Sequence, residues 1–315
     1  MYLEISNVAT AIGKNPYETR EKLLLISWAR HAPLNVLEYL LDNNCLAPLE
    51  ENEEYSNLQQ EIYKKNLPQT FDVKDFSNIE ERIVKEFKTI KNERNEICTQ
   101  KEIKQLKEFT QDALKKDNGN NQETNIINKE KYTKGNHKMF YYDISPNAKI
   151  GGRYDASNGS NISNGTNTGK NSDDIILEIK TRTRIQNVRR NEYDLIQLIC
   201  YLMATGKKKG KIVQVFNQVK FDSDEANEKE FGIINIEEEE YRILGEEIVK
   251  KLKLYFEELE EIIKTSKYNY LDNVIPKKIR PIGKFEKFEK YDDNTYLLEN
   301  LCEESPKFNN LLRFF

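Results

Sequence analysis

Apolar patterns typical of strands and helices alternate along this 315-residue chain, which predicts an α/β fold. A near-continuous apolar run at 174–180 is typical of a strand that is covered on both faces. Amphipathic helical patterns precede and follow it. We therefore expect strands in the middle of the chain and helical additions at both ends.

The first third of the chain is predicted to be helical. Asn15-Pro16 is a helix start, because Asn caps and Pro suits the first turn, and this helix should run to about residue 30. A second helix is expected over 34–43. Residues 50–116 carry charged helical patterns, and Asp117–Asn121 is expected to be a loop.

The middle and the end of the chain alternate between strands and helices. We expect, in order, strands at 139–144 and 149–156, a Ser/Asn/Gly-rich loop at 157–173, the strand at 174–180, a helix at 191–204, strands at 211–217 and 233–236, and a long helix at 238–264.

Charged residues at the end of the 174–180 run indicate a site. Side chains alternate along a strand, so Glu178 and Lys180 share one face, while Leu177 and Ile179 point to the other. Charges in a covered strand need partners, and Mg²⁺ takes carboxylate and carbonyl oxygens. We expect Asp155, Glu178 and the carbonyl of Ile179 as ligands. Lys180 would hold or help deprotonate the attacking water and offset phosphate charge. The alternative is an exposed edge strand with a charge pair.

The helix predicted at 191–204 places polar groups beside that site. Tyr193, Gln197 and Tyr201 recur at helical spacing on a face distinct from its apolar stripe. A Gln directed at a metal site can orient water or a phosphate. The alternative is a polar helix edge that faces solvent.

These residues resemble a known family. The order Asp155, Glu178-x-Lys180, Gln197-x-x-x-Tyr201 is similar to the PD-(D/E)XK nuclease superfamily, in particular to the branch of lambda exonuclease and the YqaJ-like viral recombination nucleases. The segment 5–17 resembles the N-terminal segment of that branch. The resemblance covers about residues 1–30 and 119–217, and the usual Pro before the first Asp is absent.

The resemblance implies a fold and a catalytic set. It implies one nuclease domain with a restriction-endonuclease-like core at 119–236, in which helices flank a mixed central sheet, with a mainly helical part at 1–118 and a helical extension at 237–315. It implies Mg²⁺ or Mn²⁺ as cofactor. It also implies an upstream glutamate ligand, for which Glu123, after Gly119, is favoured over Glu81.

The implied activity is a metal-dependent DNA nuclease. The expected role is an exonuclease that processes DNA ends in viral or phage-type recombination, repair or replication, often beside a single-strand annealing protein. An endonuclease of the same fold and a non-catalytic module that binds DNA ends or a partner are the alternatives. The Asn/Lys-rich composition is consistent with an AT-rich genome, such as that of a large DNA virus.

Charge and cysteine patterns bound the remaining expectations. The net charge is only −4, so a DNA-binding chain must concentrate its positive charge locally. The arginines expected to contact DNA are Arg153, Arg182, Arg184, Arg189 and Arg190.

Four scattered cysteines without a Cys-x-x-Cys pair argue against an iron–sulfur cluster and against disulfides. We expect an intracellular, soluble protein without a signal peptide or a membrane span. If it is viral, it should lie in the host cytoplasm, in the host nucleus or in the virion. Whether it forms a homo-oligomer is left open by the sequence.

Overall fold

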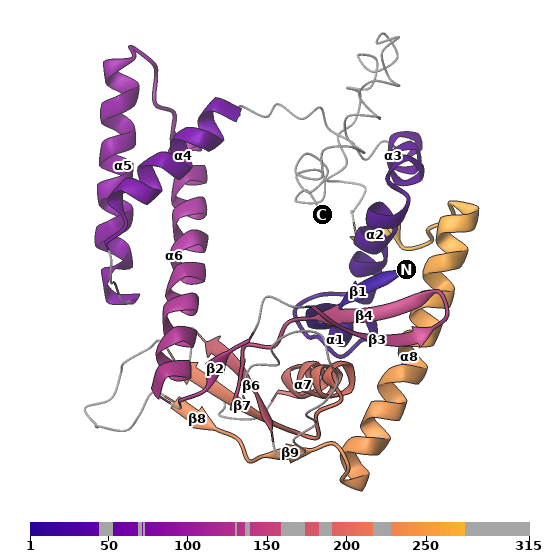
Figure 1. The fold of residues 1–315 in the computed structure, drawn as a ribbon. Helices are drawn as coiled ribbons and strands as arrows, with labels where there is room; N and C mark the ends of the chain where they lie inside the picture. Colours follow the sequence, from indigo (N-terminus) through magenta and orange to yellow (C-terminus); the bar gives the residue numbers. More distant parts are fainter. Residues whose placement is uncertain are drawn as a thin grey trace.

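The protein is a mixed α/β structure in which helices surround two mixed β-sheets (Figure 1). The computed structural model describes residues 1–43, 53–68, 71, 73–129, 131–135, 139–158, 174–182, 191–216 and 228–274. Most of the loop predicted at 157–173 lies outside these ranges, as do Arg184, Arg189 and Arg190.

The first sheet has the strand order β1-β4-β3. Strand β1 (Tyr2–Glu4) runs parallel to β4 (Ala148–Gly152), and β3 (Phe140–Ser145) pairs antiparallel with β4. The N-terminus of the chain is therefore joined to its middle. Ile144 and Ile150 point from this sheet into the main hydrophobic core.

The second sheet has the strand order β2-β5-β6-β7-β8, with β9 also paired to β7. Its strands are β2 (Thr133–Lys134), β5 (Ala156–Ser157), β6 (Ile175–Arg182), β7 (Lys209–Phe216), β8 (Glu228–Glu230) and β9 (Ile234–Asn235). Strands β6 and β7 are parallel, and helix α7 (Glu192–Thr205) forms the crossover that a parallel pair requires.

The single strand predicted at 149–156 is divided between the two sheets. Strand β4 ends at Gly152, and β5 begins at Ala156 beside β6. The chain changes sheets over Arg153–Asp155, so the alternating pattern continues although the pairing does not. Asp155 consequently lies at the junction of the two sheets.

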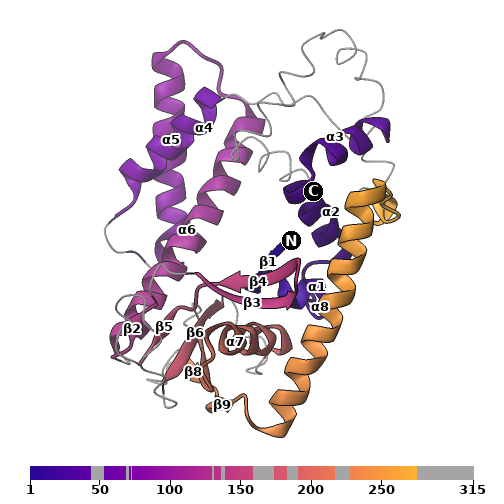
Figure 2. The ribbon, with the colours of Figure 1, turned by 45° about the vertical axis from the view of Figure 1, so that its right-hand side comes forward.

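The remaining helices of the body lie beside the first sheet (Figure 2) and share one core with it and with α7, in which Trp28 and Tyr255 are fully buried. They are η1 (Ile5–Asn7), α1 (Val8–Ala11), α2 (Arg20–His31), α3 (Pro33–Asp42), α8 (Glu239–Thr265) and α9 (Leu271–Val274). Within the described ranges, none of the helices is both long enough and apolar enough to cross a bilayer.

The predicted helix start at Asn15-Pro16 is wrong. Helix α2 begins at Arg20, because the Thr19 hydroxyl accepts a hydrogen bond from the Lys22 amide at 3.3 Å and caps it. Asn15 forms a turn instead, in which its side chain accepts from the Tyr17 amide at 3.0 Å.

Three helices form an arm that extends away from the sheets (Figures 1 and 2). They are α4 (Glu53–Asn66), α5 (Phe76–Glu93), which the short η2 (Val73–Asp75) precedes, and the first half of α6 (Gln100–Lys129). The arm has its own core, which includes Ile83, Phe87 and Leu106. The second half of α6 packs Ile126 and Ile127 on the second sheet.

The loop predicted at Asp117–Asn121 is wrong, because these residues lie inside α6. Their intrinsic helix propensity is low, but packing at both ends of the helix outweighs it. The Tyr63 hydroxyl also donates to Asp117 at 2.8 Å. The boundary expected between residues 118 and 119 falls within this continuous helix, which links arm and sheet.

Candidate functional site

Strand β6 separates an apolar face from a charged one, as the sequence predicts. Leu177 and Ile179 pack under the end of α6. Glu178 and Lys180 point to the opposite side, toward α7, and Glu178 is only 2% exposed. Such deep burial of a carboxylate is costly unless charges or hydrogen-bond donors surround it. The alternative of an exposed edge strand does not apply, because β6 lies between β5 and β7.

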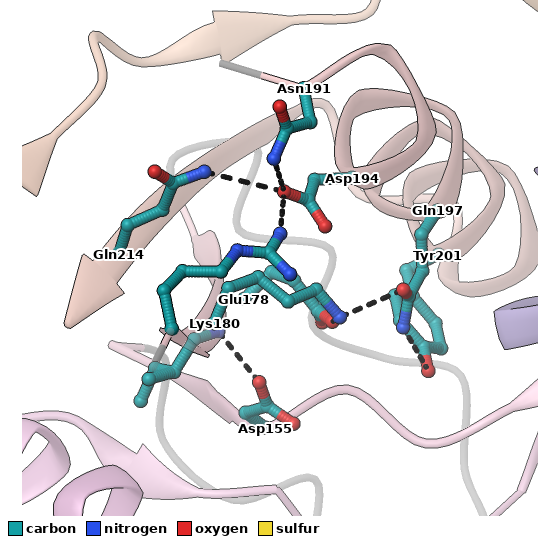
Figure 3. A network of polar contacts seen from close by, with 10 residues as sticks. Asp155, Glu178, Lys180, Asn191, Asp194, Gln197, Tyr201 and Gln214 are labelled. Atoms are coloured by element: carbon teal, nitrogen blue, oxygen red, sulfur yellow. Dashed lines mark hydrogen bonds and ion pairs between the residues drawn. The ribbon is translucent and has the colours of Figure 1, made fainter. Parts of the chain in front are cut away.

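Asp155 reaches this strand from the junction between the sheets. Its Oδ2 accepts a hydrogen bond from the Ile179 amide at 2.6 Å, which fixes the carboxyl group beside Glu178 (Figure 3). The backbone carbonyl of Asp155 accepts from the Gly135 amide at 2.7 Å. Both bonds hold a residue that belongs to neither strand. The expectation that the Ile179 carbonyl is a metal ligand stays a prediction.

Lys180 joins the strand to helix α7. Its ammonium donates to Glu178 Oε1 at 2.6 Å and to Gln197 Oε1 at 2.8 Å (Figure 3). The Gln197 amide donates to the Tyr201 hydroxyl at 3.4 Å. Tyr201 in turn lies against Gly152, where an added Cβ would come within 2.9 Å of the ring. Gly152 is therefore needed for the close packing of β4 on this tyrosine.

The pKa values of the two carboxyl groups and of the lysine in this cluster are all raised. Burial raises the pKa of Asp155 well above its ordinary value, and the nearby Glu178 carboxylate raises it further. Burial also raises the pKa of Glu178, although Lys180 opposes the shift. Burial alone would lower the pKa of Lys180, but the Glu178 carboxylate outweighs it and raises that pKa. Lys180 therefore donates as an ammonium in this arrangement, and its expected part in deprotonating the attacking water stays a prediction.

The two upstream glutamates differ in position. Glu123, on the part of α6 that packs on the second sheet, is close enough to raise the pKa of both Asp155 and Glu178. Its carboxylate also lies 3.8 Å from the Lys134 ammonium. Glu81 lies on α5 in the arm, and its charge acts on Lys107 there.

Glu123 nevertheless does not complete a three-ligand cluster. Among the residues whose positions are described, no group of three or more His, Cys, Asp or Glu side chains is placed to hold a metal ion. A site built here would use Asp155 and Glu178, with Glu123 nearby. One or two carboxylates completed by waters and phosphate oxygens are the usual protein share of a Mg²⁺ site.

A second buried cluster, which the sequence did not indicate, adjoins the first. Asp194 on α7 is fully buried, and its Oδ2 accepts from Arg182, from Asn191 at 3.4 Å and from Gln214 at 3.3 Å (Figure 3). Arg182 lies two residues beyond Lys180, and Asp194 lies three residues before Gln197. The cluster therefore fixes α7 against β6. The sequence feature that points to this cluster is an aspartate within an otherwise apolar helix.

The arginines predicted to contact DNA divide into three groups. Arg182 forms an ion pair with Asp194, and its guanidinium also lies 5.2 Å from the centre of the Tyr193 ring. Arg153 is exposed at the end of β4. Arg184, Arg189 and Arg190 lie outside the described residues.

The comparisons with known proteins leave family and activity open. No family model matches the chain, and no curated protein matches it. One solved structure, "Crystal structure of SSO0001", is similar at a TM-score of 0.32 and 18% identity, covering 69% of this chain and 88% of that one. A likeness this low supports no statement about function.

Proposed function

We propose that this protein is a metal-dependent nuclease that hydrolyses phosphodiester bonds in DNA and has a restriction-endonuclease-like core. The observation that carries the proposal is the convergence of Asp155, Glu178, Lys180 and Gln197 from a sheet junction, one strand face and one helix. The pKa values of both Asp155 and Glu178 are raised by burial, and strongly perturbed pKa values cluster at catalytic sites.

The donor set fits a hard divalent cation. Glu178 Oε2 is buried and has no hydrogen-bond partner among the described residues, so one lone-pair-rich oxygen of the cluster is left unsatisfied. Asp155 and Glu178 would hold Mg²⁺ or Mn²⁺ at this point. When bound, such an ion lowers the pKa of water and polarises a phosphate oxygen.

The side chains of the site have distinct roles in this proposal. Lys180 donates from a fixed position between Glu178 and Gln197, where its charge offsets the negative charge that develops on the phosphate. Gln197 holds Lys180 in place and is itself held by Tyr201. The backbone of Ile179 keeps Asp155 in position. An arrangement fixed before substrate binds avoids reorganisation during the reaction.

The proposal is tested with end-labelled linear DNA and closed circular DNA, in Mg²⁺ and in EDTA. We expect cleavage that requires metal and that falls by a factor of hundreds to thousands in Glu178→Gln and in Lys180→Ala. Release of labelled ends from linear DNA without cleavage of circular DNA identifies an exonuclease. Nicking of circular DNA identifies an endonuclease.

The control is Glu260→Gln, the same chemical change at an exposed position on α8. It should cleave as the wild-type protein does. Circular dichroism and thermal unfolding establish that each variant is folded. If a folded Glu178→Gln protein cleaves at the wild-type rate, the site is wrong. If wild-type protein binds DNA but never cleaves it, a non-catalytic binding module replaces the nuclease.

A further inference from the structure

The first sheet has one face that helices cover and one that is exposed. Helices α7 and α8 pack against one side (Figure 2), and Ile144 and Ile150 are buried there. The opposite side carries Glu4 on β1, Lys149 on β4 and Asp143 on β3, all of them exposed. We call this opposite side the outer face. Its residues alternate with core residues, so their orientation follows from the strand period of two.

Aromatic rings lie on the outer face beside cations. Tyr141 is 48% exposed, and the Lys149 ammonium lies 4.6 Å from the centre of its ring. Tyr2 lies next to Tyr141, with ring centres 6.1 Å apart. Gly151 lets the Tyr141 ring lie down across β4, because an added Cβ would come within 2.6 Å of the ring.

The outer face leads directly to the candidate active site. Along β4 and the residues after it, Lys149, Gly151, Arg153 and Asp155 alternate with the buried Ile150 and Tyr154. Arg153 follows β4 directly and its charge acts on the Tyr2 hydroxyl, so it lies beside the outer face, and Asp155 comes two residues later in the chain. Of the acids on this face, Glu4 is paired with Arg30 at 3.6 Å, and Asp143 lies opposite Lys149, at the end far from Asp155. Each acid thus has a basic residue beside it, and Arg153 adds positive charge between this face and Asp155.

We infer that the outer face binds a single strand of DNA and guides it to Asp155. The inference rests on the proposed nuclease function for the direction of the strand, but binding itself does not require catalysis. Tyr141 and Tyr2 offer rings for base stacking, while Lys149 and Arg153 meet phosphates. Stacking on a tyrosine requires unpaired bases, which a duplex interior does not present. A base that stacks on Tyr141 displaces the flexible Lys149 ammonium onto the backbone phosphate.

The test measures binding without cleavage. Fluorescence anisotropy in EDTA follows a labelled oligothymidylate of about 15 nucleotides over a series of salt concentrations. We expect Tyr141→Ala to raise Kd about fivefold or more, and Tyr141→Phe to bind nearly as the wild type does. Lys149→Ala and Arg153→Ala should each reduce the slope of log K against log salt by about 0.7. The same sequence in a duplex should depend much less on Tyr141.

Matched controls lie elsewhere on the surface. Lys253→Ala removes an exposed lysine of α8, and Tyr17→Ala removes a tyrosine that is 77% exposed. Both should leave Kd unchanged. The inference is wrong if wild-type protein does not bind the oligonucleotide, if Tyr141→Ala and Arg153→Ala bind normally, or if Tyr17→Ala has the larger effect. Binding that maps to the outer face in a protein that never cleaves DNA overturns the nuclease and leaves the surface in place.

Discussion

Replacing Asp155 by Asn should stabilise the metal-free protein while it abolishes metal binding. The amide oxygen of Asn can still accept from the Ile179 amide, so the bond that positions the side chain is kept. The substitution removes a partly buried negative charge beside Glu178 and Glu123. At an effective dielectric constant of about 20, two like charges about 4 Å apart repel by about 4 kcal/mol, and more distant ones by less. Lys180 attracts Asp155 and offsets part of the repulsion, which leaves a net gain of about 1–2 kcal/mol.

The stability gained by the Asp155→Asn substitution should increase with pH. Burial and the Glu178 carboxylate raise the pKa of Asp155 in the folded protein. The folded state therefore binds more protons than the unfolded state above the ordinary Asp pKa of about 3.9, and stability falls as pH rises through this range. Asn does not titrate. The two proteins should differ little at pH values below the ordinary Asp pKa, and the variant should be the more stable one at neutral pH.

Urea unfolding in EDTA at several pH values measures this difference in stability. Urea unfolding in the presence of Mg²⁺ measures how strongly each protein binds the metal. At a concentration ten times its Kd, the ion should stabilise wild-type protein by about 1.4 kcal/mol and the Asp155→Asn protein hardly at all. A variant less stable than wild type at neutral pH, or equal stabilisation of both proteins by Mg²⁺, would refute the electrostatic account of the cluster.

Three further outcomes follow. Glu123→Ala should weaken Mg²⁺ binding and cleavage, whereas Glu81→Ala on the arm should change stability by no more than about 0.5 kcal/mol; equal effects in a metal titration would exclude Glu123. Arg182→Ala should cost about 3–5 kcal/mol in urea unfolding, because it leaves Asp194 buried without its cation, and a loss below 1 kcal/mol would contradict that role. Asn118→Ala in α6 should raise stability by about 1 kcal/mol, since both polar atoms of Asn118 are buried without a described partner; a lower melting temperature would indicate a partner.

The parts of the site predicted from sequence are those that depend on local periodicity. The strand period places Glu178 and Lys180 on one face, and the helix period places Gln197 and Tyr201 on another. The change of sheets at Arg153–Asp155 leaves no trace in that pattern, because side chains alternate whether or not a strand stays with its partner. The fully buried Asp194 was missed for a related reason. Its donors come from β6 and β7, which only the folded chain brings together.

The continuity of α6 through Asp117–Asn121 was missed because local propensity opposes it. Gly and Asn are weak helix formers, and their cluster is typical of a loop. The two cores at the ends of the helix reverse that preference, and neither core is visible as a local pattern.

The pairing of β1 with β4 determines when the protein can finish folding during synthesis. Tyr2 leaves the ribosome early, but its partner Lys149 is made only after the whole arm has been translated. The arm has a core of its own and local contacts, so it can become ordered first. The body finishes later, because β4 must pair with β1 and β3, and β6, which follows Asp155 in the chain, must pair with β5. The pairing of β1 with β4 thus separates an arm that can form early from a site that forms late.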